Sequence, residues 1–420
     1  MAVPPEHGDS RPPPLAADQH APFLRAPEAS RSIFLVIFAA ALAPLAAGVV
    51  FFGWRALAIT ALSVCGCMAV ESAYYRVTRT PALLGRSHAA VTGLLLALTL
   101  PPFAPWYVPL VGAVFAIIVG KAIFGGVGHF LWQPALVGRL AVAVIFAPPI
   151  GSLNPELWPV LAQPQMILGD VTESRPEPTY RTWRGTSAPP AADAFELRRP
   201  RETLRELTVR AKMPPDSITD AIRHMPPAWD LICGAHAGGI GETSTIVILI
   251  AGLYLVYRNY VRAHLPGLMI LAAAATVAIA PIRAGPEGAW QWLPITAQGL
   301  DVGFTYVCYH IACGELMLAA WFMATEMTSR PVTAPAQAIF GILCGVAAML
   351  GRLYMEVTIP TYLAVLACST LTPALDVIRP RPLGQRRFWQ RRRRPTAQDP
   401  ATNSSTEHGS GTAPGDAGQP

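Results

Sequence analysis

Long apolar runs, separated by short polar or basic connections, fill most of the chain. A helix that crosses a bilayer needs about 20 predominantly apolar residues, and most of these runs approach that length. Residues 89–100 are too short and are stopped by Pro101 and Pro102, so we interpret them as part of a broken or tilted helix. The pattern predicts ten spans, at residues 32–54, 56–75, 89–100, 107–124, 135–146, 243–257, 265–282, 300–323, 336–350 and 357–375.

The stretch KAIFGGVGHFLWQPALVGR, residues 121–139, interrupts this pattern with glycines and a proline. Gly125, Gly126 and Gly128 allow left-handed angles and close backbone approach, and Pro134 suits the first turn of a new helix. The stretch therefore predicts a helix, a broken loop and a second helix. Irregular backbone at membrane depth is tolerated only where protein or a water-filled cavity covers it, so we expect a site here.

The runs divide into two groups of five around a hydrophilic segment, residues 151–239. A weak repeat relates TGLLLALTLPP in the first group to ELMLAAWFMATEMTSRP in the second. An odd number of spans forces the two groups into opposite orientations, and inverted repeats with interrupted helices place a site at their interface. We therefore expect an all-α polytopic membrane protein with two inverted five-helix repeats, at residues 32–150 and 240–378.

The distribution of charged residues predicts on which side of the membrane the two ends of the chain lie. Only 14% of the 420 residues are charged, against about a quarter in soluble proteins. Most lysines and arginines of the short connections fall on one side with the arginine-rich tail, which predicts that both termini are cytoplasmic and that residues 151–239 lie in the periplasm. We expect residues 1–31 and 379–420 to be disordered tails. Arg391–Arg394 indicates an anchor on anionic lipid, and no nucleic acid is expected.

A few ionisable residues stand inside or beside the apolar runs. Glu315 lies within the run 300–323, where a charge is expensive, and is the leading candidate for an ion pathway. Glu242 precedes a predicted helix and is interpreted as its cap. Lys121 is interpreted as an interfacial lysine, Glu326 as a capping or solvated group, and His310 as a hydrogen-bonded packing residue. No metal site is predicted.

Four motifs together resemble the RnfD/NqrB family, the large membrane subunits of the Rnf and Na⁺-translocating NADH:quinone reductase complexes. Residues 121–139 resemble its FGGxG…NPAxxGR signature, and residues 88–102 its first broken helix. WDLICGAHAGGIGETS, residues 229–244, resembles WDLFLG…GSIGETS, and residues 314–333 resemble GGLMLGAFFMATDPVTSPVT. The resemblance implies a fold similar to urea transporters, the other membrane subunits of such a complex as partners, and a bacterial inner membrane.

The resemblance also implies FMN as a cofactor. In the family, FMN is joined through its phosphate to a threonine in a [ST]GATPL segment, which is not intact here. Thr203, in RPRETLREL, is the best positional match, and Thr186, in GTSAPP, is the second choice. Both lack the small Gly-Ala approach, so covalent attachment and its loss both remain open. Gly125, Gly126 and Gly128 are further candidates for contact with the cofactor.

A first function and two alternatives to it follow from these observations. The first is an RnfD-like component of an ion-translocating electron transport complex, a translocase that passes electrons through flavin and couples this to Na⁺ or H⁺ movement. The alternative is a diverged channel or transporter of the same fold without a redox role, or a structural scaffold. Copurifying partner subunits and flavin absorbance would separate them.

Overall fold

The computed structural model describes residues 30–79, 87–102, 104–146, 232–234, 239–283, 290–297, 299–355, 357 and 359–378. These residues are helical, with one short antiparallel ladder between β1 (Ile282–Arg283) and β2 (Trp290–Gln291). The all-α prediction is therefore confirmed apart from this ladder. The predicted tails and nearly all of the predicted periplasmic segment lie outside the described residues.

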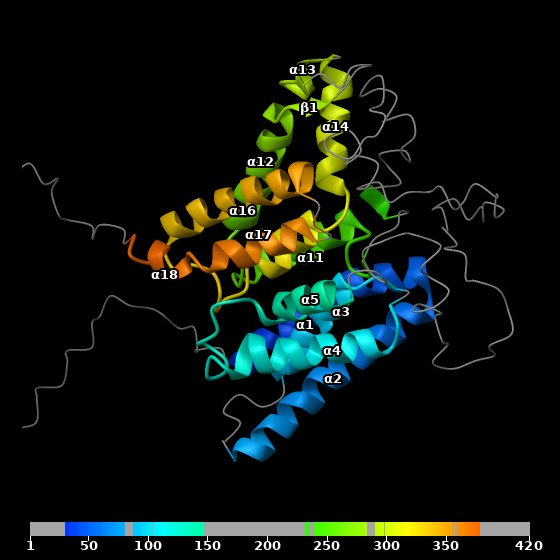
Figure 1. Ribbon diagram of the computed structural model, residues 1–420, viewed down its shortest axis with the longest axis vertical. Helices are drawn as coiled ribbons and strands as arrows, with labels where there is room; N and C mark the ends of the chain where they lie inside the picture. Colours follow the sequence, from blue (N-terminus) through cyan, green and yellow to red (C-terminus); the bar gives the residue numbers. More distant parts are fainter. Residues whose placement is uncertain are drawn as a thin grey trace, which may run out of the picture. The chain divides into compact units, whose positions relative to one another are not determined.

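The first group of helices contains one short helix that is buried along most of its length. It is α3 (Ser87–Thr99), whose leucines from Leu94 to Leu98 are buried. Helix α2 packs against α3 and α4, and α4 packs against α5, so α3 is surrounded by its own group (Figure 1). The group comprises α1 (Ser30–Phe52), α2 (Trp54–Thr78), α3, α4 (Tyr107–Ile117), the π-helical turn η1 (Ile118–Ala122) and α5 (Pro134–Ile145).

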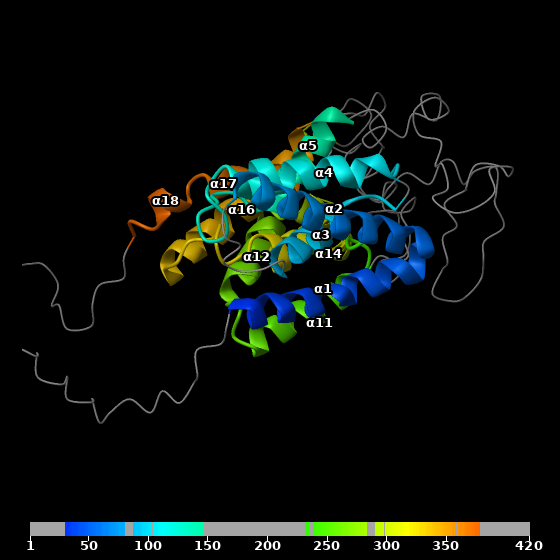
Figure 2. The same ribbon diagram turned by 90° about the horizontal axis from the view of Figure 1, so that it is seen from below.

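The second group packs in a related way. Helix α12 packs against α14, the π-helical turn η4 and α16, and α16 packs against α17 (Figures 1 and 2). The group comprises α11 (Thr245–Tyr257), α12 (His264–Ile279), α13 (Pro294–Ala297), α14 (Leu300–Ala312), α15 (Leu316–Leu318), η4 (Ala319–Met323), α16 (Ala334–Tyr354), α17 (Pro360–Ser369) and α18 (Thr372–Leu375).

Glycines let the backbones of neighbouring segments approach each other closely at two of these contacts. A Cβ atom added to Gly345 of α16 would collide with the carbonyl oxygen of Met269 on α12. A Cβ atom added to Gly48 of α1 would collide with the carbonyl oxygen of Ile240, just before α11. Small residues at such contacts are how helices in apolar surroundings gain packing contact, since lipid gives no hydrophobic drive for helix association. The two groups meet where α1 packs against α11 and α5 against α17.

The helix lengths correct the predicted spans. Within the described residues, three helices are long and apolar enough to cross a membrane, α1, α2 and α16, and a fourth crossing results if the bent pair of residues 300–312 and 316–323 counts as one. The predicted span at residues 300–323 is a broken one, because the chain bends by 61° between residues 300–312 and 316–323. Gly314 makes this possible with a φ of 73°. Residues 357–375 likewise form two helices, α17 and α18.

Candidate functional site

The C-terminal end of α3 is closed by backbone and side-chain donors from other helices. The last carbonyls of a helix have no partner within the helix. Here Gly241 N donates to Leu98 O at 2.8 Å and Ile240 N donates to Leu100 O at 2.9 Å. The buried Arg139 of α5 donates from Nε to Thr99 O at 3.1 Å. The loop before α11 and the Arg139 side chain of α5 therefore both bind the C-terminal end of α3.

The carbonyl groups at the interruption between α14 and α15 are likewise hydrogen-bonded by a side chain from another helix. Arg352 of α16 donates from Nη1 to His310 O at 2.6 Å and to Cys313 O at 3.2 Å. A guanidinium is favourable there because the C-terminal end of a helix carries partial negative charge. The Nη2 atom of Arg352 lies 3.5 Å from Thr361 Oγ1, which connects the interruption to the first turn of α17.

Glu315 lies within the predicted span, at the interruption between α14 and α15. Its side chain is fully buried, and its Oε2 accepts a hydrogen bond from Tyr362 N at 3.3 Å. Tyr362 is the third residue of α17, whose N-cap, Ile359, has no side-chain acceptor. Glu315 therefore supplies from another helix the carboxylate that the positive end of α17 favours.

Glu242 contacts the same tyrosine from the other side. Tyr362 Oη donates to Glu242 Oε1 at 2.6 Å, and Gly239 N donates to Glu242 Oε2 at 3.1 Å. The interpretation of Glu242 as the cap of α11 is wrong, because Ser244 is the N-cap and its Oγ accepts from Val247 N. Glu242 is therefore available for a contact between distant segments.

These residues form one group, which we name the central polar cluster: Arg139, Glu242, Glu315, Arg352 and Tyr362. Each is buried. Tyr362 is within electrostatic reach of Glu242, Glu315 and Arg139, and Arg352 contacts the neighbouring Thr361. The cluster therefore connects the C-terminal end of α3 with the interruption between α14 and α15. Two carboxylates and two guanidiniums balance formally. Buried ionisable groups among apolar helices are expensive, and they mark ion pathways or other functional sites.

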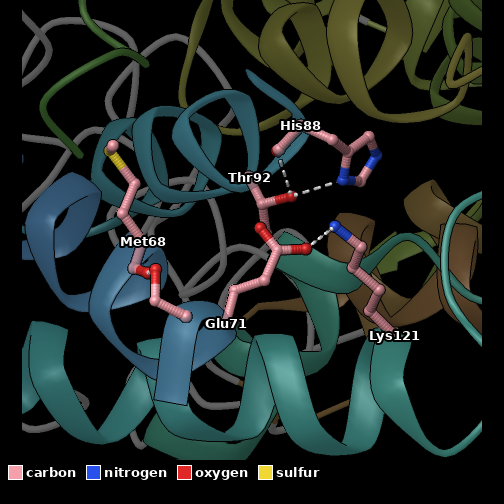
Figure 3. Close-up of polar contacts among 6 residues, drawn as sticks. Met68, Glu71, His88, Thr92 and Lys121 are labelled. Carbon is pink, nitrogen blue, oxygen red and sulfur yellow. Dashed lines mark hydrogen bonds and ion pairs between the residues drawn. The ribbon is translucent and has the colours of Figure 1, made fainter. Parts of the chain in front are cut away.

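A buried ion pair outside the central polar cluster joins Lys121 of η1 to Glu71 of α2 (Figure 3). Each residue is 3% exposed, so the interpretation of Lys121 as an interfacial lysine is wrong. Near the pair, His88 packs its ring between Phe34 and Phe130, and Thr92 Oγ1 lies 3.4 Å from His88 Nδ1. Lys121 lies at a π-helical turn, a feature often found at functional sites.

Comparison with known proteins agrees with the motifs that supply these residues. A family model described as the NQR2, RnfD, RnfE family matches residues 18–384. The chain belongs to this family. The apolar helices and the membership together make it a multi-pass membrane protein.

Curated relatives of the NQR2, RnfD, RnfE family cover most of the chain. The D component of the ion-translocating oxidoreductase complex of Halorhodospira halophila is 30% identical over 375 residues, covering 87% of this chain and 95% of that protein. The D component of the Na⁺-translocating ferredoxin:NAD⁺ oxidoreductase complex of Acetobacterium woodii is 31% identical, covering 84% and 91%. The proton-translocating counterpart of Clostridium ljungdahlii is 27% identical, covering 78% and 84%.

The glycine loop of the family signature has the predicted backbone. Gly125, Gly126 and Gly128 have φ angles of 96°, 104° and 98°, and Pro134 begins α5. A Cβ atom added to any of the three glycines would meet no atom within 4 Å. Within the described part of the chain, the glycines therefore serve the left-handed turn and not a close approach. Their contact with a cofactor stays a prediction.

The other residues singled out from the sequence are His310, Glu326, Thr203 and Thr186. His310 is buried and stacks edge-to-face on Tyr306 at 4.7 Å, but its ring nitrogens make no hydrogen bond to any residue that the structure describes. Glu326 is buried, so its interpretation as a solvated group is wrong, and its carboxylate accepts from the backbone of Met327 and Thr328 in a turn, not at the start of a helix. Thr203 and Thr186 lie outside the described residues.

Proposed function

We propose that this chain is the RnfD-like component of an Rnf-type, ion-translocating electron transport complex, and that Na⁺ or H⁺ crosses it through the central polar cluster. The names of its relatives support the complex: they are D components of oxidoreductases that move ions, Na⁺ in one bacterium and protons in another. The other subunits of such a complex would be its partners. A bacterial inner membrane with both termini in the cytoplasm accords with the charge distribution.

The proposed architecture is ten spans in two inverted five-helix repeats, similar to urea transporters. Among the described residues, three long helices, one bent pair and six shorter apolar helices supply ten segments. The packing of α2 on α3 and α4 parallels that of α12 on η4 and α16, and the packing of α4 on α5 parallels that of α16 on α17. Both α5 and α17 begin with proline, Pro134 and Pro360, and these two helices pack together.

The single observation that carries the proposal is the position of Tyr362 between two buried carboxylates. Its hydroxyl binds Glu242 and its backbone N–H binds Glu315, so the two acids lie on the two sides of one residue. Carboxylate, hydroxyl and carbonyl oxygens are the groups that a monovalent cation or a proton needs in a dry interior. Arg139 and Arg352 donate to carbonyl groups at helix ends. Each guanidinium therefore both satisfies a helix end and balances the charge of the acids.

The function is tested with the complex and with the chain alone. The tagged chain should copurify with other membrane subunits. In vesicles, the complex should take up Na⁺ or protons when reduced ferredoxin and NAD⁺ are supplied. A sodium ionophore and a protonophore, added in separate runs, identify the ion. The chain alone should show no cation flux. Flux through the chain alone, with no partner subunit recovered, would instead show a channel or transporter and contradict the proposal.

A further inference from the structure

The ion pair of Glu71 and Lys121 lies at the end of α3 opposite the central polar cluster. Its neighbour His88 is in the first turn of α3, whereas Arg139 binds Thr99, the last residue of that helix. An ion pair this buried is not explained by stability. Removing two charges from water costs as much as or more than their attraction returns, and apolar replacements of such pairs are often neutral or stabilising. Another role must account for it.

The pair is asymmetric. Glu71 Oε1 accepts from Lys121 Nζ, whereas Glu71 Oε2 is buried and has no hydrogen-bond partner among the residues that the structure describes. An unpartnered, buried carboxylate oxygen is costly, because it has lost its water and gained nothing in return. The carboxylate thus has one occupied and one open acceptor position.

The neighbouring groups decide what can bind at that oxygen. Lys121 blocks one side of the carboxylate and repels a second cation, so a sodium ion would have a single carboxylate oxygen and an adjacent positive charge. A proton needs only one oxygen and no ligand shell. The groups that interact electrostatically with Glu71 or Lys121 from the surrounding elements are Cys67, Tyr75, His88 and Glu326.

Glu326 is the second carboxylate that Lys121 acts on. It follows η4 of the second helix group, and its Oε1 is buried without a partner within the described residues. Arg330 also acts on Glu326. Arg330 acts on Glu326 more strongly than Lys121 does, so Glu71, which Lys121 binds, is the principal carboxylate partner of Lys121.

We propose that Glu71 and Lys121 form a proton-loading site, in which Glu71 Oε2 takes up one proton while Lys121 Nζ stays hydrogen-bonded to Glu71 Oε1. In the loading step a hydronium ion transfers its proton to Glu71 Oε2 and leaves as water. The carboxylate becomes a neutral carboxylic acid, and its ion pair with Lys121 becomes an ordinary hydrogen bond. Loss of the proton to water restores the pair. The site is separate from the central polar cluster and does not require that ions pass there.

Infrared difference spectroscopy of the purified chain in lipid vesicles tests the protonation directly, without partner subunits or ion uptake. Acidification should produce protonated-carboxyl bands from the exposed acids and one further component from Glu71. The Glu71 component should be absent from Glu71→Gln and present in Asp301→Asn, a matched variant that removes an exposed carboxylate. A difference spectrum left unchanged by Glu71→Gln at every pH at which the chain is folded would overturn the proposal.

A double variant separates proton loading from a structural role. Single substitutions leave one buried charge alone, and either could fail to fold. The variant Glu71→Gln/Lys121→Met removes both charges and should fold with a wild-type melting temperature. In the complex it should lower the coupled ion uptake at least tenfold. Wild-type uptake by the folded double variant would show that the pair is only structural. If the wild-type complex moves no ions, the infrared titration still decides the matter.

Discussion

The hydroxyl of Tyr362 donates a hydrogen bond to Glu242 at 2.6 Å, although the two residues are 120 positions apart. The contact joins α17 to the loop that closes the C-terminal end of α3. A phenol that is buried among apolar helices needs a partner, and a carboxylate is a strong one. This bond is the link between the two carboxylates of the central polar cluster.

Removing the Tyr362 hydroxyl should lower the free energy of unfolding. Tyr362→Phe leaves the backbone N–H for Glu315 but takes the only hydroxyl donor that the structure shows for Glu242. We expect a loss of about 1.5–3 kcal/mol, as for a buried hydrogen bond to a charged group, seen as a lower melting temperature in detergent. Tyr257→Phe, at a residue that is 80% exposed, should leave the melting temperature unchanged. Equal melting temperatures for both variants would contradict the buried bond.

Arg352 should not tolerate lysine. Its guanidinium reaches two carbonyls at the end of α14 and a hydroxyl in α17, which the single ammonium of lysine cannot match in geometry. Arg352→Lys should cost about 1–3 kcal/mol of unfolding free energy, because carbonyl groups that have lost their water are left unpaired. Arg76→Lys, at an exposed residue, is the control. Denaturant unfolding that shows no difference between the two variants would contradict this assignment.

Adding a methyl group to a glycine of the glycine loop should lower the free energy of unfolding through backbone strain alone. Gly126 has a φ of 104° with open space around its Cβ position. Gly126→Ala should cost about 1–2 kcal/mol because L-residues avoid that region. Gly267, in α12, also has open space but no positive φ, so Gly267→Ala should be neutral or stabilise by up to about 1 kcal/mol. The pair of variants separates strain from space, and opposite signs in their melting-temperature shifts are the expected result.

The flavin prediction has its own test. Peptide mass spectrometry of the purified chain should find a flavin-phosphate adduct on Thr203. Thr203→Ala should remove it and Thr186→Ala should leave it in place, and the reverse result would assign the second choice. Absence of an adduct on every threonine of residues 151–239 would show that covalent attachment has been lost.

The sequence predicted the features that local chemistry decides. Pro101 and Pro102 stop α3 where expected, Pro134 begins α5, and the three glycines adopt left-handed angles. Apolar runs also located most of the helices. These features depend on a residue and its neighbours in the chain, so a single sequence is enough to find them.

Contacts between distant residues were not predictable in this way. Glu71 stands 50 positions from Lys121, inside the predicted span 56–75, and nothing in the local sequence indicates that the two residues meet. Capping was assigned to Glu242 because of its place before α11, but Ser244 fills that role and frees Glu242 for Tyr362. The break at Gly314 was not located because a single glycine inside a long, mostly apolar run does not by itself end a helix.

Coupled cation uptake by a Glu315→Gln complex tests the central claim most directly. Glutamine keeps an oxygen for Tyr362 N but removes the charge. In vesicles supplied with reduced ferredoxin and NAD⁺, we predict that uptake falls at least tenfold, whereas electron transfer in the presence of ionophore stays within about twofold of the wild type. Asp301→Asn, an exposed acid on α14, should change neither rate. Unchanged uptake by the folded Glu315→Gln complex would contradict an ion path through the central polar cluster.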